Sequence, residues 1–259
     1  MDKTADSIRS MADSIRAQIV QDRRYLHQIP EIGMDLPETS AYIRKRLDEM
    51  GIPWKECGGD VTEKMTEDFI QAGFPRMEKA TGVTAVIGKG SPCILLRADM
   101  DALPIREEND LEFRSCNEMG HMCGHDSHAA MLLGAAQILK NMEDQLAGTV
   151  KLMFQPGEET GAGARMMVGD GLLEEPKVDA AFGIHVQPTE ETGTVGYSMG
   201  VNSASLDTFI VKIRGKGGHS SQPHLCVDPL MIMNQVYQEV NLVVTREADP
   251  AAMVALTCG

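Results

Sequence analysis

A nine-residue segment, GHMCGHDSH at residues 120–128, carries the densest set of chemically versatile side chains in the sequence. It holds three histidines, one cysteine and one aspartate. Only Gly124 separates Cys123 from His125, and the backbone freedom of glycine allows a tight turn that presents both side chains to one point. The start of a predicted helix (127–142) favours Cys123 as a thiolate, the form that binds metal. The segment predicts a metal site, with a buried thiol beside hydrogen-bonded histidines as the alternative.

Two further sets of polar residues follow apolar runs at the ends of predicted strands. Glu158 and Glu159 come just after TVKLMF, and His185 lies near the end of AAFGIHV. Adjacent residues in extended chain point to opposite sides, so one glutamate can hold a metal while the other faces a substrate. A solvated acidic turn and a structural histidine are the ordinary alternatives. Together with Cys123 and His125, however, these residues favour one Zn- or Mn-type site.

The elements that must position these residues alternate between helices and strands. Apolar residues at helical spacing predict helices over 4–26, 38–50, 61–74 and 127–142. Apolar runs that end in polar residues predict strands over 81–90, 93–101, 149–159 and 180–186. This order predicts an α/β fold, a layered domain with a central sheet. Ligands of such domains gather at the carboxyl ends of the strands, which is where the candidate residues fall.

The pattern changes near residue 205, where a second domain is expected. Residues 206–218 alternate as a half-exposed strand, a helix is predicted near 227–246, and a further strand over 253–258. We therefore predict a metal-binding domain over residues 1–204 and a smaller, incomplete α+β domain over residues 205–259.

The composition excludes two classes of partner. Asp and Glu number 38 against 24 Lys and Arg, which gives a net charge of −14. Such a surface repels nucleic acid and anionic lipid, both of which need clustered basic residues. No run approaches the ~18 apolar residues of a membrane span, and the N-terminus lacks the apolar core of a signal peptide. Six cysteines without framework spacing agree with a reducing compartment, so we expect a cytoplasmic protein that acts on a small molecule.

Six segments resemble, in family order, the signatures of the M20 metallopeptidases and amidohydrolases. The resemblance is strongest to the N-acyl-amino-acid branch, which includes hydrolases of hippurate and of auxin (IAA) conjugates. It extends over nearly the whole chain. The segments are RRYLHQIPEIG (23–33), LLRADMDALPIRE (95–107), MGHMCGHDSHAAMLLGAA (119–136), FQPGEETGAGA (154–164), FGIHV (182–186) and GKGGHSSQPH (215–224).

The resemblance implies a pair of divalent cations, Mn²⁺ or Zn²⁺, with Co²⁺ and Ni²⁺ as further options. It implies that Cys123 bridges the two cations and that His125, Glu159 and His185 are terminal ligands. Asp99 stands where other M20 branches carry a ligand histidine, and here His125 is expected to replace it.

The resemblance also implies three residues that serve the reaction itself. Glu158 is the expected general base of a metal-assisted hydrolysis, and Asp101 the carboxylate that orients a ligand imidazole. His219 is expected to reach the active site of a dimer partner and to stabilise the tetrahedral intermediate. Residues 205–259 would then be part of a lid and dimerisation domain, and the substrate an N-acyl amino acid.

Four histidines remain outside this scheme. His27 is expected to be a hydrogen-bonded packing residue, and His224 has no predicted role. His121 and His128 flank the Cys-Gly-His turn. Two explanations account for them equally well: they support the metal ligands, or they reflect the ordinary polarity of a helix start.

Several alternatives share or replace this chemistry. N-acetyldiaminopimelate deacetylase and M20 dipeptidase activities use the same ligand set. The family is expected to continue beyond Gly259 and to supply one more ligand histidine, so an inactive metal-binding fragment is a second class of interpretation. A serine hydrolase lacks support because no G-x-S-x-G motif occurs, and GKGGHS follows an exposed strand, the wrong context for a dinucleotide-binding loop.

Overall fold

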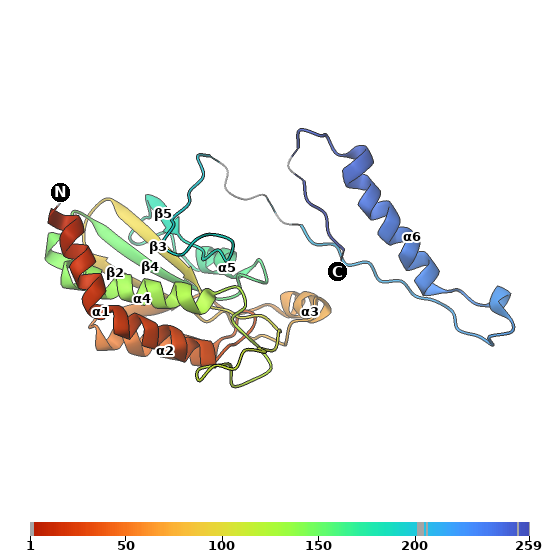
Figure 1. Ribbon diagram of the computed structural model, residues 1–259, viewed down its shortest axis with the longest axis horizontal. Coiled ribbons are helices and arrows are strands. Elements are labelled where there is room, and N and C mark those ends of the chain that lie inside the picture. Colours follow the sequence, from red (N-terminus) through yellow and green to blue (C-terminus); the bar gives the residue numbers. More distant parts are fainter. Residues whose placement is uncertain (1–2, 201–204, 206, 253, 259) are drawn as a thin grey trace. The chain divides into compact units, whose positions relative to one another are not determined.

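The chain forms two compact units, which are described separately. The computed structural model describes residues 3–200, 205, 207–252 and 254–258. The first unit is Met1–Glu190 and contains the sheet, while the second is Glu191–Gly259 and contains one long helix, blue in Figure 1.

Five strands in the first unit form one mixed sheet in the order β1-β2-β4-β3-β5. The strands are β1 (Trp54–Cys57), β2 (Gly82–Gly88), β3 (Cys93–Asp99), β4 (Thr149–Gln155) and β5 (Ala180–Gly183). β3 runs parallel to β4 and β5, whereas β2 runs antiparallel to β1 and β4. Asp99 at the end of β3 lies opposite Gln155 at the end of β4. The carboxyl ends of β3, β4 and β5 therefore meet at one edge, and the predicted α/β class is confirmed.

Helices cover both faces of this sheet (Figure 1). α2 (Pro37–Glu49) and α4 (His125–Asn141) pack on one face, and α1 (Lys3–Gln28) packs along α4. α5 (Gly163–Gly169) packs on the other face, against β4. A short helix, α3 (Glu63–Gln71), precedes β2 and confirms the helix predicted over 61–74.

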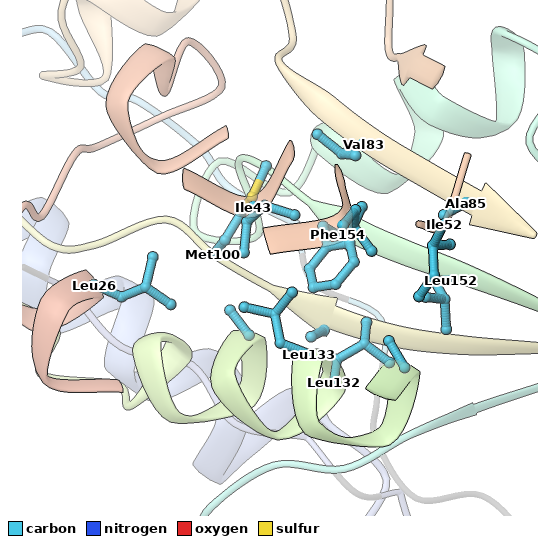
Figure 2. Packing of buried hydrophobic residues seen from close by; sticks show 14 of the residues in the cluster. Leu26, Ile43, Ile52, Val83, Ala85, Met100, Leu132, Leu133, Leu152 and Phe154 are labelled. Atoms are coloured by element: carbon cyan, nitrogen blue, oxygen red, sulfur yellow. The ribbon is translucent and has the colours of Figure 1, made fainter. Parts of the chain in front are cut away.

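The main core lies between the sheet and α4, as Figure 2 shows. Leu132 and Leu133 of α4 join the same buried cluster as Leu152 and Phe154 of β4. Met153, between the last two, faces the α5 side instead because successive strand residues point to opposite faces. Each large buried side chain stabilises the fold by roughly 1.5–3 kcal/mol, so this layer holds the carboxyl edge of the sheet rigidly against α4.

α4 begins at His125, two residues earlier than the sequence pattern predicted. Gly124 is its N-cap and adopts a left-handed conformation, with φ of 88°. Asp126 lies in the first turn, where a negative charge is favourable near the helix N-terminus. The metal-site motif is thus divided between a turn and the first turn of a helix.

Two short elements, one a strand of the sheet and the other a helix packed on it, were not predicted. β1 has only four residues and alternates weakly, so it becomes a strand through its pairing with β2. α5 contains two glycines in seven residues, a composition with poor helix propensity, and it is held by the packing of Met167 against the sheet.

The second unit differs more from prediction. The helix expected near 227–246 is confirmed as α6 (Pro229–Leu242) followed by a π-helical turn (Val243–Glu247). The prediction of a strand over 206–218 is wrong for residues 207–218, which form no strand. Their one β-type contact is an isolated bridge between Lys216 and Val227. Residues 254–258 form no strand either, while residues 206 and 253 lie outside the described part. None of the described helices is long and apolar enough to cross a membrane.

Candidate metal centre

Five of the predicted site residues come together where β3, β4 and β5 end. The imidazole Nε2 of His125 lies 3.9 Å from an oxygen of Glu158 and 3.9 Å from an oxygen of Glu159. Sγ of Cys123 lies 3.3 Å from Nε2 of His185. Ligand atoms in each of the trios Cys123–His125–His185 and His125–Glu158–Glu159 fall within 4.8 Å of one another. Thiol, imidazole and carboxylate groups therefore surround one point, as a transition-metal site requires.

His125 is the central residue of this cluster and is completely buried. Its Nδ1 donates to the backbone oxygen of Asp101 at 2.9 Å and lies 3.3 Å from a carboxylate oxygen of the same residue. Nε2 faces the carboxylates of Asp99, Glu158 and Glu159 but has no hydrogen-bond partner among the described residues. A buried nitrogen in that state is suited to ligate a cation, so the residues present fit a metal.

Asp101 also contacts the glutamate turn. One of its carboxylate oxygens accepts the backbone N–H of Glu159 at 3.0 Å. A single buried carboxylate thus connects His125 with the turn that carries the two glutamates. These are the contacts that the predicted orienting role of Asp101 requires.

The expectation that Glu158 and Glu159 point to opposite sides is wrong. β4 ends at Gln155, and the glutamates lie in a turn closed by a hydrogen bond from Gly161 N–H to the Glu158 oxygen. Both carboxylates therefore reach the same histidine. They differ instead in exposure, since the side chain of Glu158 is 41% exposed and that of Glu159 is 22% exposed.

The electrostatics of the cluster also correct a prediction. Burial and the nearby carboxylates, chiefly Glu159, raise the pKa of Cys123 to about 11, so the protein alone does not favour a thiolate. Cys123 lies just before Gly124, the N-cap of α4, and the net shift of its pKa is nevertheless upward. Burial and the charges of Glu158 and Asp101 likewise raise the pKa of Glu159. Such an excess of negative charge is what a divalent cation compensates.

Asp99 is buried at the end of β3 and also lies beside His125. One carboxylate oxygen lies 3.7 Å from Nε2 of His125 and 2.7 Å from the guanidinium of Arg97. The other accepts a 2.6 Å hydrogen bond from Nδ1 of His128. Burial alone would raise the pKa of Asp99, but the His128 bond and the charge of Arg97 hold it below its ordinary value.

His128 is one of the histidines for which the sequence left two explanations open, and it joins the cluster through Asp99. It lies three positions after His125, so both imidazoles project from the same side of α4, and it is 2% exposed. Its Nε2 accepts the backbone N–H of Val186 at 2.9 Å. The three-residue spacing between His125 and His128 could have indicated that His128 lies beside the candidate ligands.

A second buried network lies behind the cluster and supports the start of α4. Asp126 accepts a 2.7 Å hydrogen bond from His27 and forms an ion pair with Arg23, whose Nε lies 2.9 Å from the carboxylate. The other nitrogen of His27 lies 3.1 Å from Glu107. The hydrogen bond to Asp126, opposed by burial, raises the pKa of His27. The prediction that His27 is a hydrogen-bonded packing residue is confirmed.

His219 belongs to the second unit. It is exposed, and its Nδ1 accepts hydrogen bonds from the N–H and hydroxyl of Ser221 at 3.2 and 2.8 Å. Its expected role in a partner's active site stays a prediction.

The fold and the cluster define a layered α/β protein with a candidate metal centre at the carboxyl edge of its sheet. The chain belongs to the Peptidase family M20/M25/M40, whose model matches residues 95–256. The resemblance inferred from the motifs is therefore confirmed.

Individual relatives agree with this membership. The chain is 40% identical over 249 residues to the N-acetyl-L-cysteine deacetylase of Bacillus subtilis, covering 95% of this chain and 55% of the relative. It is 40% identical over 230 residues to the IAA-amino acid hydrolase ILR1-like 5 of Arabidopsis thaliana, covering 88% and 48%. The YXEP protein of Bacillus subtilis, described as a dinuclear metal binding peptidase from the M20 family, superposes with a TM-score of 0.60 at 36% identity, covering 72% of this chain and 47% of that one. The chain thus spans about half the length of these relatives.

Proposed function

We propose that this chain is part of a metal-dependent amidohydrolase, an enzyme that cleaves the amide bond of N-acyl amino acids. The observation that carries the proposal is Nε2 of His125, which is buried among carboxylates and beside Cys123 and His185 and has no hydrogen-bond partner in the described part of the chain. Such a set of donors is more specific for a metal than any one of the residues, because each alone has an ordinary structural explanation.

The proposed ligands are Cys123, His125, Glu159 and His185, which would hold a pair of divalent cations. Mn²⁺ and Zn²⁺ are the proposed metals, since the set mixes a soft thiolate with imidazole and carboxylate groups. The chemistry that such cations supply is a polarised carbonyl oxygen and a water of lowered pKa. Asp101 holds Nδ1 of His125 and so keeps Nε2 available as a ligand.

Glu158 is the proposed general base. Of the two glutamates it is the more exposed, so it can meet a substrate while Glu159 faces inward. It takes a proton from the attacking water and returns it to the leaving amine. His219, from the partner subunit's copy of the chain, donates a hydrogen bond to the oxyanion.

The proposed substrate class follows from the relatives, one described as an N-acetyl-L-cysteine deacetylase and another as an IAA-amino acid hydrolase. N-acetyldiaminopimelate deacetylation and dipeptide cleavage are alternatives within the same chemistry. We further propose that residues 1–204 form the catalytic domain, that residues 205–259 form part of a lid and dimerisation domain, and that the protein acts as a cytoplasmic homodimer.

The two glutamates provide the test, because they differ by one position and should differ in effect. With Mn²⁺, Co²⁺ or Zn²⁺ added, hydrolysis of N-acetyl and N-aroyl amino acids should fall roughly 10²–10⁴-fold in kcat for Glu158→Gln while metal content is retained. Glu159→Gln should instead weaken metal binding itself. Equal loss of activity with normal metal binding in both variants contradicts this division of roles.

A metal-binding but inactive protein is the second candidate function, because the same cluster of donors would hold a metal whether or not hydrolysis follows. The same experiment separates the two. Two bound cations without hydrolysis of any substrate in the screen would support that second function for this chain.

A further inference from the structure

His185 lies in a part of the chain that its own strand does not hold firmly. β5 ends at Gly183, and residues 184–187 belong to no helix or strand. Within the described part of the chain, β5 is an edge strand that pairs with β3 alone, and all four of its residues are exposed. Burial therefore contributes little to the position of His185, and another contact must set the imidazole against Cys123.

The neighbouring residue, Val186, supplies that contact. Its N–H donates to Nε2 of His128 at 2.9 Å, and the rings of His128 and His185 meet edge to face with centroids 4.5 Å apart. Val186 also sits directly on Gly124, where a Cβ would lie 2.4 Å from Cγ2 of the valine. The segment after β5 is thus attached to the turn and the helix start that carry Cys123 and His125.

The direction of these hydrogen bonds defines the state of His128. A backbone N–H can only donate, so Nε2 of His128 is the acceptor and its proton resides on Nδ1. That proton is donated to Asp99 at 2.6 Å. Both ring nitrogens are therefore engaged. His128 and Asp99 could hold a cation together with His125 only if the bond to Val186 were broken.

Asp99 is in turn a fixed point of the fold. It ends β3, is completely buried and is held from the other side by Arg97 at 2.7 Å. The sequence of contacts therefore runs from the rigid sheet through Asp99 and His128 to the backbone beside His185.

We propose that Asp99 and His128 are positioning residues that hold the His185 segment against the Cys123–His125 turn and so pre-arrange the metal ligands. This inference rests on the proposed metal centre, since it assigns His185 as a ligand. The loss of a supporting residue of this kind typically weakens metal binding about 10–100-fold.

Two substitutions of one residue test the hydrogen bond itself. His128→Gln carries an amide oxygen about as far from the backbone as Nε2, so it can still accept from Val186. His128→Asn carries a donor for Asp99 but is too short to reach Val186. Cobalt(II) titration, monitored by thiolate-to-cobalt absorption from Cys123, should show about 10–100-fold weaker binding for His128→Asn and a smaller loss for His128→Gln.

Three further measurements make the result specific. His121→Asn removes another buried histidine of the same segment, one without a hydrogen bond to residues 184–187, and should bind cobalt normally. Thermal unfolding of each variant separates a lost ligand from a lost fold. In the unaltered protein, amide exchange should be slow at Val186 and fast at its neighbours, a measurement that needs no variant.

His185→Ala is the reference for the metal centre. If it loses cobalt affinity but His128→Asn does not, or if the Val186 amide is unprotected, the positioning role is wrong. If His128→Asn and His128→Gln both lose one whole equivalent of cobalt, His128 is itself a ligand and the proposal is overturned. Normal cobalt binding by both His185→Ala and Cys123→Ser would overturn the proposed centre and this inference with it.

Discussion

β2 and residues 207–213 have similar apolar alternation but very different structures. β2, GVTAVIG, lies between β1 and β4 and buries Val83, Ala85 and Ile87 in the main core. Residues 207–213, DTFIVKI, belong to no strand, and the side chains of Phe209 and Val211 are 84% and 54% exposed. Alternation therefore shows which face of a strand could be buried, whereas a partner decides whether the strand forms. The two units are expected to respond differently to the same kinds of substitution.

The largest difference is expected for the removal of a phenylalanine. Phe154 is fully buried between the sheet and α4, so Phe154→Ala leaves a cavity and should reduce the free energy of unfolding by about 3–5 kcal/mol. Phe209→Ala removes the same atoms from an exposed position and should change it by less than about 0.5 kcal/mol. Urea unfolding of both variants measures this. Similar losses in the two would mean that the second unit has a core of its own.

A smaller difference in stability between the two units is expected when a histidine of each unit is replaced. His27 is bonded to Asp126 and Glu107, and these bonds, against the effect of burial, raise its pKa above the ordinary 6.5. Its charged form thus stabilises the fold below that pH, and the contribution is lost as pH rises through the raised pKa. His27→Gln should therefore lower stability at about pH 6 by about 1.5–3 kcal/mol, the contribution of hydrogen bonds to a charged group.

The pH dependence is the decisive part of the His27 prediction. The difference in stability between His27→Gln and the unaltered protein should narrow as the pH rises above 6.5 and through the raised pKa of His27, because its imidazolium then deprotonates. Exposed His224 is the matched control, and His224→Gln should leave thermal unfolding unchanged across this range. A difference that stays constant with pH would mean that His27 contributes packing and not charge.

The smallest difference is expected for two glycines with nearly the same backbone conformation. Gly124 and Gly193 have φ of 88° and 93°, so alanine is strained at either position by about 1–2 kcal/mol. Gly124→Ala also meets Val186, whereas a Cβ at Gly193 meets nothing within 4 Å. Thermal unfolding should show a larger loss for Gly124→Ala, together with weaker cobalt binding. Equal losses and normal binding would show that Val186 moves aside without consequence.

The sequence alone determined the layered α/β fold of the first unit and the edge where the candidate residues meet. The reason is that periodicity and apolar runs identify long buried elements, and parallel strands bring their carboxyl ends to one side of a sheet. The order of these elements is therefore enough to place His125, Glu158, Glu159 and His185 near one another. β1 and α5 could not be predicted in this way, because their residues have weak preferences and pairing or packing with distant segments decides their form.

Tertiary structure alone decided how the residues at that edge act on one another. The turn after β4 aims both glutamates at His125, and burial together with the carboxylates gathered there raises the pKa of Cys123. The hydrogen bond that His128 donates to Asp99 and the one that it accepts from Val186 join residues 29 and 58 positions apart. Spacing along a chain reports which face of an element a residue occupies, but charge and hydrogen bonding depend on distances of a few ångströms between segments. Only the packed fold sets those distances.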